Sequence, residues 1–402
     1  MDILLAALLL VWGDVSAASP EATYEQLVQA SIHTQNAIIA QQQGEGTDPI
    51  PDSALVDGTD EDGQFIKVDP APDTPYIKGV YATAHSAGGA RLQDLITLLN
   101  ETELNSLVID IKDDWGNVTW VTDNEIIQEL GTTKKIIGDM GKLMTTLEEN
   151  EIYPIARIVV FKDSILAKKK PEWSFLTAGG DIWMNGRKEN FVNPYRQEVW
   201  DYNIEVAKEA IKMGFKEIQF DYVRFPEGFE KKADSLSFDT DERSRVDVVA
   251  EFVEYAREQL NHLGARISVD IFGYAASVPA AEGIGQDFVK ISKFVDVISP
   301  MIYPSHYSTG WYGSKVPDAN PYVTINGATE DTHKKLEPLV ELQQKPIIRP
   351  WIQDFTATWI PGYIKYGKHE IEEQIRALND NDVHEYLLWN AGNRYTSGVE
   401  YK

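Results

Sequence analysis

Eight short runs rich in β-branched residues recur along the chain from Tyr76 onward, and helical patterns separate them. The runs cover residues 78–83, 106–112, 155–161, 217–222, 266–272, 295–303, 346–352 and 386–389. Apolar residues at spacings of three and four predict helices over 91–101 and 134–150. Start and stop signals predict two more, from Asn193-Pro194 to Gly214 and from 241 to 263, before Gly264. Eight strands alternating with helices predict an α/β chain that forms a single (β/α)8 TIM barrel rather than an open sheet.

The first 75 residues do not follow this alternation. The apolar run 3–12, followed by the small residues 16–19, predicts a signal peptide over 1–18, although Asp2 stands where a basic residue is usual. An uncleaved anchor and a buried N-terminal helix are the alternatives. Residues 19–75 predict a helix over 21–43 and then an extended arm rich in Pro, Gly and Asp. The barrel itself covers 76–402. Because its eighth strand ends close to the C-terminus, we expect the 21–43 helix to cover the slot between the seventh and first helices.

Composition excludes several classes of function. The chain has no cysteine, which excludes disulfides, thiolate metal sites and a cysteine nucleophile. Its formal net charge of −26 disfavours nucleic acid and anionic lipid as partners, and favours neutral or cationic ligands such as a partly deacetylated amino-sugar polymer. No G-x-G-x-x-G follows a strand, and no phosphate-binding loop, G-x-S-x-G or paired-histidine metal motif occurs. We therefore expect no cofactor, no metal and no stable membrane insertion beyond the N-terminal segment.

Strand parity assigns side chains to the barrel interior, because successive residues of a strand point to opposite faces. Apolar side chains form the helix-facing set on each strand, so Asp110, Asp221 and Asp270 face inward on three separate strands. An interior built only for stability would carry Val, Ile and Leu at these places. The same parity predicts that further polar and aromatic side chains face inward, namely Tyr81, Lys112, Arg157, Tyr303, Arg349, Trp351 and Gln353.

Aromatic residues are dense in the loops that follow the strands. Trp311 follows the sixth strand, several rings follow the seventh, and Trp389 lies on the eighth. Flat rings beside carboxylates suit sugars, whose C–H faces pack on aromatic faces. Arg224, three residues after Asp221, joins the candidate substrate-binding residues, and His85 and His306 are placed to line the cleft.

Paired carboxylates with aromatic subsites predict glycoside hydrolysis. Neighbouring strands lie ~4.8 Å apart, so Asp221 and Asp270 approach the ~5–5.5 Å separation of a retaining pair. Asp110 is the third catalytic candidate, and its separation from Asp221 would be wider and nearer the inverting range. We expect Arg157 to keep Asp221 ionised as nucleophile or base, and Asp270 to donate the proton. Two alternatives remain: a carbohydrate-binding barrel without catalysis, and a structural envelope protein in which Arg157, Lys112 and Arg349 pair all the aspartates.

Six of the strand motifs resemble one family. They are Lys78-Gly79-Val80-Tyr81, Val108-Ile109-Asp110-Ile111-Lys112, Ala156-Arg157-Ile158-Val159, Phe220-Asp221-Tyr222-Val223-Arg224-Phe225-Pro226, Val269-Asp270-Ile271-Phe272-Gly273 and Ser299-Pro300-Met301-Ile302-Tyr303-Pro304. From Tyr76 to about Tyr395 the chain resembles the glycoside hydrolase TIM-barrel domain family of secreted bacterial proteins. The resemblance implies a secreted or cell-surface bacterial enzyme whose substrate is an extracellular or cell-wall polysaccharide.

Overall fold

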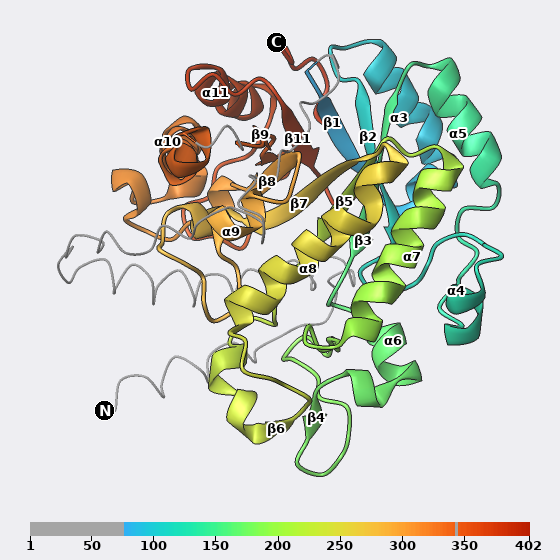
Figure 1. Cartoon of the computed structure of the whole chain (residues 1–402). Coiled ribbons are helices and arrows are strands. Elements are labelled where there is room, and N and C mark those ends of the chain that lie inside the picture. The colour runs from blue at the N-terminus through green and yellow to red at the C-terminus, as the bar shows by residue number, and fades with distance from the viewer. Residues whose placement is uncertain (1–75, 342–344) are drawn as a thin grey trace, which may run out of the picture.

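The computed structural model describes residues 76–341 and 345–402. Their central feature is a closed barrel of parallel strands surrounded by helices (Figure 1). The barrel strands are β1 (Lys78–Ala82), β2 (Ser106–Lys112), β3 (Tyr153–Val159), β5 (Glu217–Asp221), β7 (Arg266–Phe272), β8 (Val297–Met301), β9 (Ile347–Ile348), β10 (Trp351–Gln353) and β11 (Tyr386–Trp389). β9 and β10 together occupy one strand position of the barrel, between β8 and β11. They are two strands and not one because Pro350 lies between them and cannot donate a backbone hydrogen bond. Pairing of β10 with both β8 and β11 closes the ring, which confirms the predicted (β/α)8 barrel.

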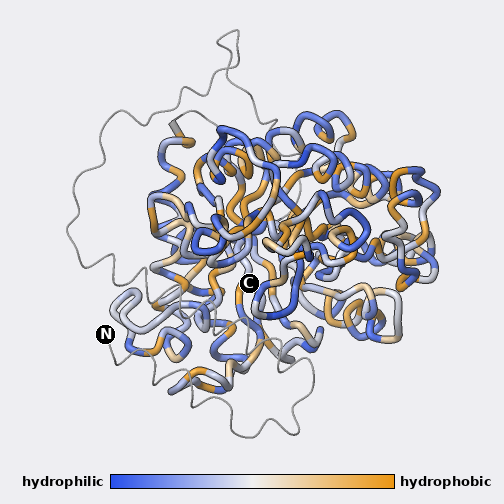
Figure 2. Tube along the Cα trace, turned by 90° about the horizontal axis from the view of Figure 1, so that it is seen from below, coloured by the Kyte–Doolittle hydropathy of each residue, from blue (hydrophilic) through white to orange (hydrophobic). Residues whose placement is uncertain are grey.

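The helices follow the strands in the expected order. They are α2 (Ala84–Ala87), α3 (Arg91–Asn100), α4 (Glu125–Leu130), α5 (Met140–Glu149), α6 (Ser164–Lys169), α7 (Gln197–Met213), α8 (Arg245–Leu260), α9 (Phe288–Ser292), α10 (Pro321–Glu341) and α11 (Lys368–Asn379). Hydrophobic and hydrophilic stretches alternate along the chain in Figure 2, as expected for helices with one face on a sheet. Outside the barrel, β4 (Leu176–Thr177) and β6 (Leu236–Ser237) form a small antiparallel sheet.

Three helix starts differ from the prediction. α5 begins at Met140 and not at 134, because the Asp139 carboxylate accepts from Lys142 N as an N-cap. α7 begins at Gln197 and not at Asn193-Pro194, because the Asn193 side chain instead stabilises the preceding turn, accepting from Tyr195 N and donating to Asp239 O. α8 begins after Ser244, whose hydroxyl accepts from Asp247 N as an N-cap. Both stop signals hold: α7 ends at Gly214, which has a φ of 106°. After α8 a short 3-10 turn ends at Gly264, which has a φ of 78°.

Two layers of core fill the fold. The larger lies between strands and helices, and the smaller lies inside the barrel, where Tyr81, Val108, Ile155, Trp351 and Leu387 pack together. Inside and outside faces therefore alternate along the strands as parity predicts, except at the end of β2.

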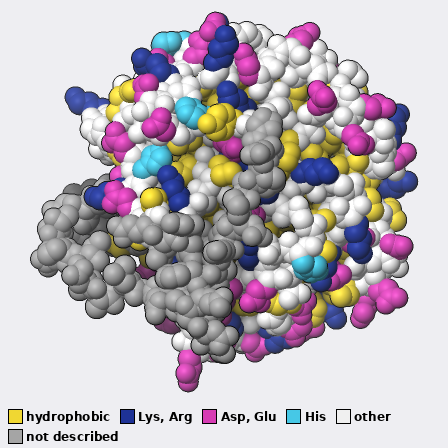
Figure 3. Space-filling view, turned by 45° about the horizontal axis from the view of Figure 1, so that its top comes forward, with side chains coloured by type: hydrophobic (Ala, Val, Ile, Leu, Met, Phe, Trp, Pro, Cys, Tyr) yellow, Lys and Arg dark blue, Asp and Glu magenta, His cyan; other side chains and the backbone are white. Residues whose placement is uncertain are grey.

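The C-terminal segment packs beside β1 and β11. Tyr401 is buried, and its carbonyl accepts hydrogen bonds from the Tyr386 hydroxyl and the Lys78 ammonium. The predicted signal peptide, the 21–43 helix and the arm lie outside the described residues. None of the helices in 76–341 and 345–402 has the length and apolar character of a membrane span. On the face shown in Figure 3, acidic and basic side chains are interspersed.

Candidate active site

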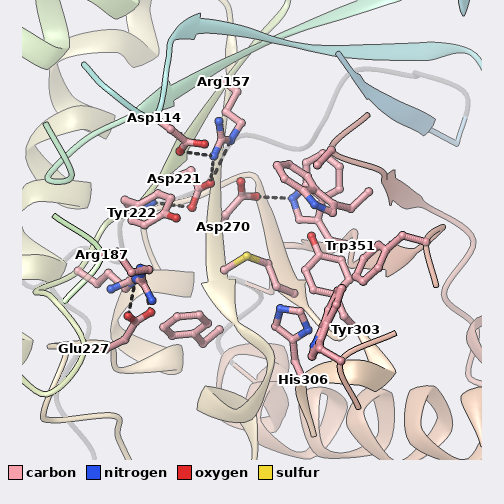
Figure 4. Close-up of a pocket in the computed structure, with 17 residues that line it drawn as sticks. Asp114, Arg157, Arg187, Asp221, Tyr222, Glu227, Asp270, Tyr303, His306 and Trp351 are labelled. Atoms are coloured by element: carbon pink, nitrogen blue, oxygen red, sulfur yellow. Dashed lines mark hydrogen bonds and ion pairs between the residues drawn. The ribbon is translucent and has the colours of Figure 1, made fainter. Parts of the chain in front are cut away.

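A pocket opens where the strands end, and its two sides differ in chemistry (Figure 4). One side is charged and the other is aromatic, and Met301 lies among the remaining lining residues. The charged side carries Asp114, Arg157, Arg187, Asp221, Arg224, Glu227 and Asp270. The aromatic side carries Tyr303, His306, Trp351, Phe355, Trp359 and Trp389.

Asp221 is the last residue of β5, and local sequence places it in the pocket. Ile218 and Phe220 of the same strand belong to the core between strands and helices, so Asp221 points to the other face. The next residue, Tyr222, has a φ of 53°, a strained left-handed conformation for a bulky side chain. This turn brings the Tyr222 amide to 2.6 Å from Asp221 Oδ1, to which it donates. Strain directly after a buried carboxylate makes this strand end a candidate functional position.

Arg157 of β3 lies at the centre of the carboxylates. It donates to Asp221 Oδ2 from Nε at 3.0 Å and from Nη2 at 2.6 Å. It also pairs with Asp110 at 2.6 Å and with Asp114 at 3.2 Å. Its side chain is buried. Arg157 thus donates two charge-assisted hydrogen bonds to one oxygen of Asp221, and the predicted pairing of these two residues is present.

Asp270 of β7 lies beside Asp221 on the neighbouring strand. The β5–β7 register pairs Phe220 with Val269, and one step further it brings the two aspartates level. Asp270 Oδ1 accepts the Trp351 indole N–H at 2.7 Å, and Asp270 forms no ion pair with any described residue. Burial and then the charge of Asp221 raise the pKa of Asp270 well above its ordinary value. Two neighbouring carboxyl groups in such different surroundings are suited to different proton roles.

Glu227 is a pocket carboxylate that sequence reasoning missed. It lies in the loop after β5, and its carboxylate pairs with Arg187 at 2.7 Å and with Arg224 at 3.0 Å. Although burial opposes it, the two arginines lower the pKa of Glu227. Strand parity does not apply to loops, so the only signal in the sequence was an acidic residue one position after the Phe220–Pro226 motif.

The aromatic side is continuous. Tyr303 packs edge-on against His306 and Phe355, and Phe355 stacks on Trp359 with 6.0 Å between ring centroids. Trp351 packs edge-on against Trp389. Burial lowers the pKa of His306 to about 3, so its imidazole is neutral at ordinary pH. His85, the other histidine expected at the cleft, lies exposed on α2 outside the pocket lining.

The prediction that Lys112 faces the barrel interior is wrong. A bulge between Asp110 and Lys112 inserts one extra residue on β2 and reverses the parity beyond it. Lys112 therefore points into the helix layer, where it pairs with Asp163 at 2.7 Å and donates to Asn203 of α7.

Three other residues predicted to bind substrate lie outside the pocket. Arg349 faces inward as expected but at the opposite end of the barrel, because Glu217, the first residue of β5, and Glu385 hold it there. Gln353 joins two loops, accepting from Ser305 N and donating to Asp318. Trp311 is buried against Tyr307 and Tyr312 in the outer core.

Asp110 and Tyr81 lie beneath the pocket and do not line it. The Tyr81 hydroxyl donates to Asp110 Oδ2 at 2.5 Å, and the Tyr81 ring stacks on Trp389. Burial raises the pKa of Asp110 to about 6. Asp110 is thus placed to support Arg157 and Trp389 and not to touch a ligand. Across the described residues, no group of three or more His, Asp or Glu side chains could hold a metal ion.

Three solved structures are similar to this chain, and the first of them supports the barrel fold. The glycoside hydrolase domain of PgaB (BpsB) from Bordetella bronchiseptica shares 11% identity over 79% of this chain and 95% of that chain, with a TM-score of 0.54. A hypothetical protein from Ruminiclostridium thermocellum shares 39% identity over 48% of this chain and 96% of that chain, with a TM-score of 0.44. An alpha-galactosidase from Thermus thermophilus shares 12% identity over 82% and 61%, with a TM-score of 0.47.

Comparison with curated protein sequences finds no match. A family model described as "putative glycosyl hydrolase domain" matches residues 79–395, which span the barrel and every residue of the pocket. The chain belongs to this glycosyl hydrolase domain family.

Proposed function

We propose that the protein hydrolyses glycosidic bonds, with Asp221 and Asp270 as its carboxylate pair. The observation that carries the proposal is the contrast between these neighbours in one pocket. Asp221 is paired with Arg157, whereas Asp270 has a raised pKa and no ion pair within the part of the chain that the structure describes. Aromatic rings opposite them offer a surface for a sugar ring. Hydrolysis by two carboxyl groups needs one ionised and one protonated partner at the same pH.

Asp270 is the proton donor. Its Oδ1 accepts the bond from Trp351, which leaves Oδ2 to carry the proton toward the glycosidic oxygen. The proton is retained because burial and the charge of Asp221 both disfavour a second carboxylate.

Asp221 is the nucleophile. Its Oδ2 accepts two bonds from Arg157. Among the residues that the structure describes, Oδ1 accepts only the Tyr222 amide, so Oδ1 has the lone pair for attack. Because the two residues lie level on adjacent strands, which are ~4.8 Å apart, no room remains for the intervening water of an inverting enzyme. We expect the anomeric configuration to be retained.

The substrate is a carbohydrate outside the bacterial cell. This part of the proposal rests on the apolar run 3–12 and the small residues after it, which have the pattern of a signal peptide. Fractionation of cells that express the full chain tests this part. A secreted or surface-attached protein should be recovered outside the cytoplasmic fraction, and recovery in the cytoplasm alone would contradict the proposal.

Digestion of a glycan library by the purified protein tests the activity. We expect one class of glycan to be cleaved, and Asp221→Asn to lower the rate by at least about 10³-fold while glycan binding survives. Proton NMR of the first product reports the anomer. Hydrolysis that Asp221→Asn leaves intact would place the chemistry elsewhere. Binding by the wild-type protein without any cleavage would favour the carbohydrate-binding barrel.

A further inference from the structure

The net charge of the chain does not describe its pocket. The whole protein carries −26, whereas every ionised carboxylate in the pocket lining has a cationic side chain against it. We propose that the pocket takes an uncharged sugar unit, and that it discriminates against both amino sugars and uronic acids. This inference rests on the proposed glycosidase function and names its substrate class.

Two of the carboxylates share Arg157. Asp221 receives its two bonds, and Asp114 pairs with Arg157 at 3.2 Å and with Lys162 at 3.2 Å. Lys162 also lies 3.4 Å from Glu189, so this second layer adds one charge of each sign. A sugar amine would have to displace a buried guanidinium or ammonium from these groups.

The third carboxylate is enclosed between two arginines. Glu227 Oε2 pairs with Arg187 and Oε1 with Arg224, so each oxygen has its own guanidinium. Arg187 also pairs with Glu189 at 3.0 Å. A uronate would compete with Glu227 for the same N–H groups, and an amine would compete with the arginines for the same oxygens. Sugar hydroxyls both donate and accept, so they can add to this array without displacing a charge.

The other titratable groups of the lining carry no net charge that a ligand could use. Asp270 forms no ion pair with any other described residue, and burial and the charge of Asp221 raise its pKa, which favours the neutral acid; the imidazole of His306 is neutral. Beneath the lining, Asp110 is paired with Arg157. When Asp110 is counted together with the lining residues, the net charge of the pocket differs from zero by at most one unit.

The rings that lie beside the charged side already have cations against them. The Arg157 guanidinium lies 5.6 Å from the Trp389 ring centroid. Arg224 lies 4.7 Å from the ring centroids of both Tyr222 and Phe272. Arginine side chains therefore already occupy the cation–π positions on these rings that a ligand ammonium group would need. The rings farther along the aromatic side, Phe355 and Trp359, stack on each other and present flat apolar surface, which suits the C–H face of a neutral pyranose.

Binding by Asp270→Asn separates this inference from the proposed function. Asn is neutral and nearly isosteric with a protonated Asp270, so the variant keeps the charge balance while it loses the proton donor. The probes are an N-acetylated glucosamine hexamer, its deacetylated form, a neutral hexose hexamer and the matching uronate hexamer. Calorimetry is done at a pH where the amines are protonated. We expect a neutral probe to bind at least about tenfold more tightly than its charged counterpart, a difference of about 1.4 kcal/mol.

Two variants change the balance in opposite directions. Glu227→Gln leaves an excess positive charge and should raise uronate affinity relative to the neutral probe by about tenfold. Arg187→Gln leaves an excess negative charge and should do the same for the amine probe. Glu373→Gln, which removes a partner of the exposed Arg376, is the matched control and should change neither ratio. If one charge variant fails to fold, the other still gives the answer.

The outcomes are distinct. A charged probe that binds Asp270→Asn best, or probe preferences that neither charge variant moves, overturns the inference even if the enzyme hydrolyses glycans. Failure to bind any probe overturns it as well. Selective binding of neutral probes by a wild-type protein that cleaves nothing overturns the proposed function and supports the neutral pocket.

Discussion

Arg157→Met offers the sharpest test of how the pocket is held together. Methionine keeps much of the side-chain length but removes a buried guanidinium that pairs with three carboxylates. Asp114 keeps Lys162 as a partner. Asp110 and Asp221 are left with no cation at ion-pair distance among the described residues.

The expected loss of unfolding free energy depends on whether these two carboxylates stay charged or take up protons. Removing one partner of a buried ion pair costs about 3–5 kcal/mol. Each stranded carboxylate can escape by taking up a proton. At pH 7 this costs about 4 kcal/mol for an ordinary aspartate but only about 1.4 kcal/mol for Asp110, whose pKa burial already raises to about 6, so the two together set a ceiling of about 5–6 kcal/mol. We therefore expect the variant to lose about 3–6 kcal/mol of unfolding free energy at pH 7.

The loss should shrink as the pH falls. In the variant the folded state binds protons more tightly than the unfolded chain, so its stability rises as the medium becomes acidic. Burial raises the wild-type pKa of Asp110 to about 6, so below that pH the wild type already holds this proton. Between pH 6 and pH 4 the difference should then close by about 1.4 kcal/mol per pH unit, and by up to twice that above pH 6.

Chemical denaturation of the full chain from about pH 4 to about pH 7 measures this. The control is Arg376→Met, whose exposed pair with Glu373 should contribute less than about 1 kcal/mol. A variant that folds only in acid would agree with the reasoning. A loss equal to that of the control, or one independent of pH, would refute it.

Three further predictions concern activity. Asp110→Asn should keep kcat within about tenfold of wild type while Asp221→Asn loses at least about 10³-fold, because Asp110 does not line the pocket; equal losses would contradict this. Trp359→Ala should raise KM about tenfold with little change in kcat, because a stacking surface is worth about 1–1.5 kcal/mol. Tyr363→Ala, at an exposed ring of the same loop, is its control. Activity should fall as the pH rises through the raised pKa of Asp270, because the donor must be protonated. In Asp270→Asn that alkaline limb should disappear, and aryl glycosides with good leaving groups should be cleaved better than the glycan; an unchanged limb would remove Asp270 from the role.

The sequence by itself determined the barrel and the carboxylates at its mouth. Alternation of apolar and polar residues on a strand is a local property, so it places Asp221 and Asp270 on the inner face without knowledge of the rest of the chain. The order of strands follows from the alternation of strand and helix. The ion pair between Arg157 and Asp221 could be predicted as well, because consecutive parallel strands are neighbours in a barrel.

Tertiary structure decided the rest. Strand parity gives neither the position of a side chain along the barrel axis nor the place of a β-bulge. One bulge moved Lys112 into the helix layer, and the position of Arg349 along its strand placed it with Glu217 at the far end of the barrel. Arg187 and Glu227 come from loops with no repeating pattern, and only the folded chain brings their charges within 2.7 Å. The neutrality of the pocket is a sum over such pairs. A total charge counted along the sequence cannot give it, since ion pairing depends on distance and burial.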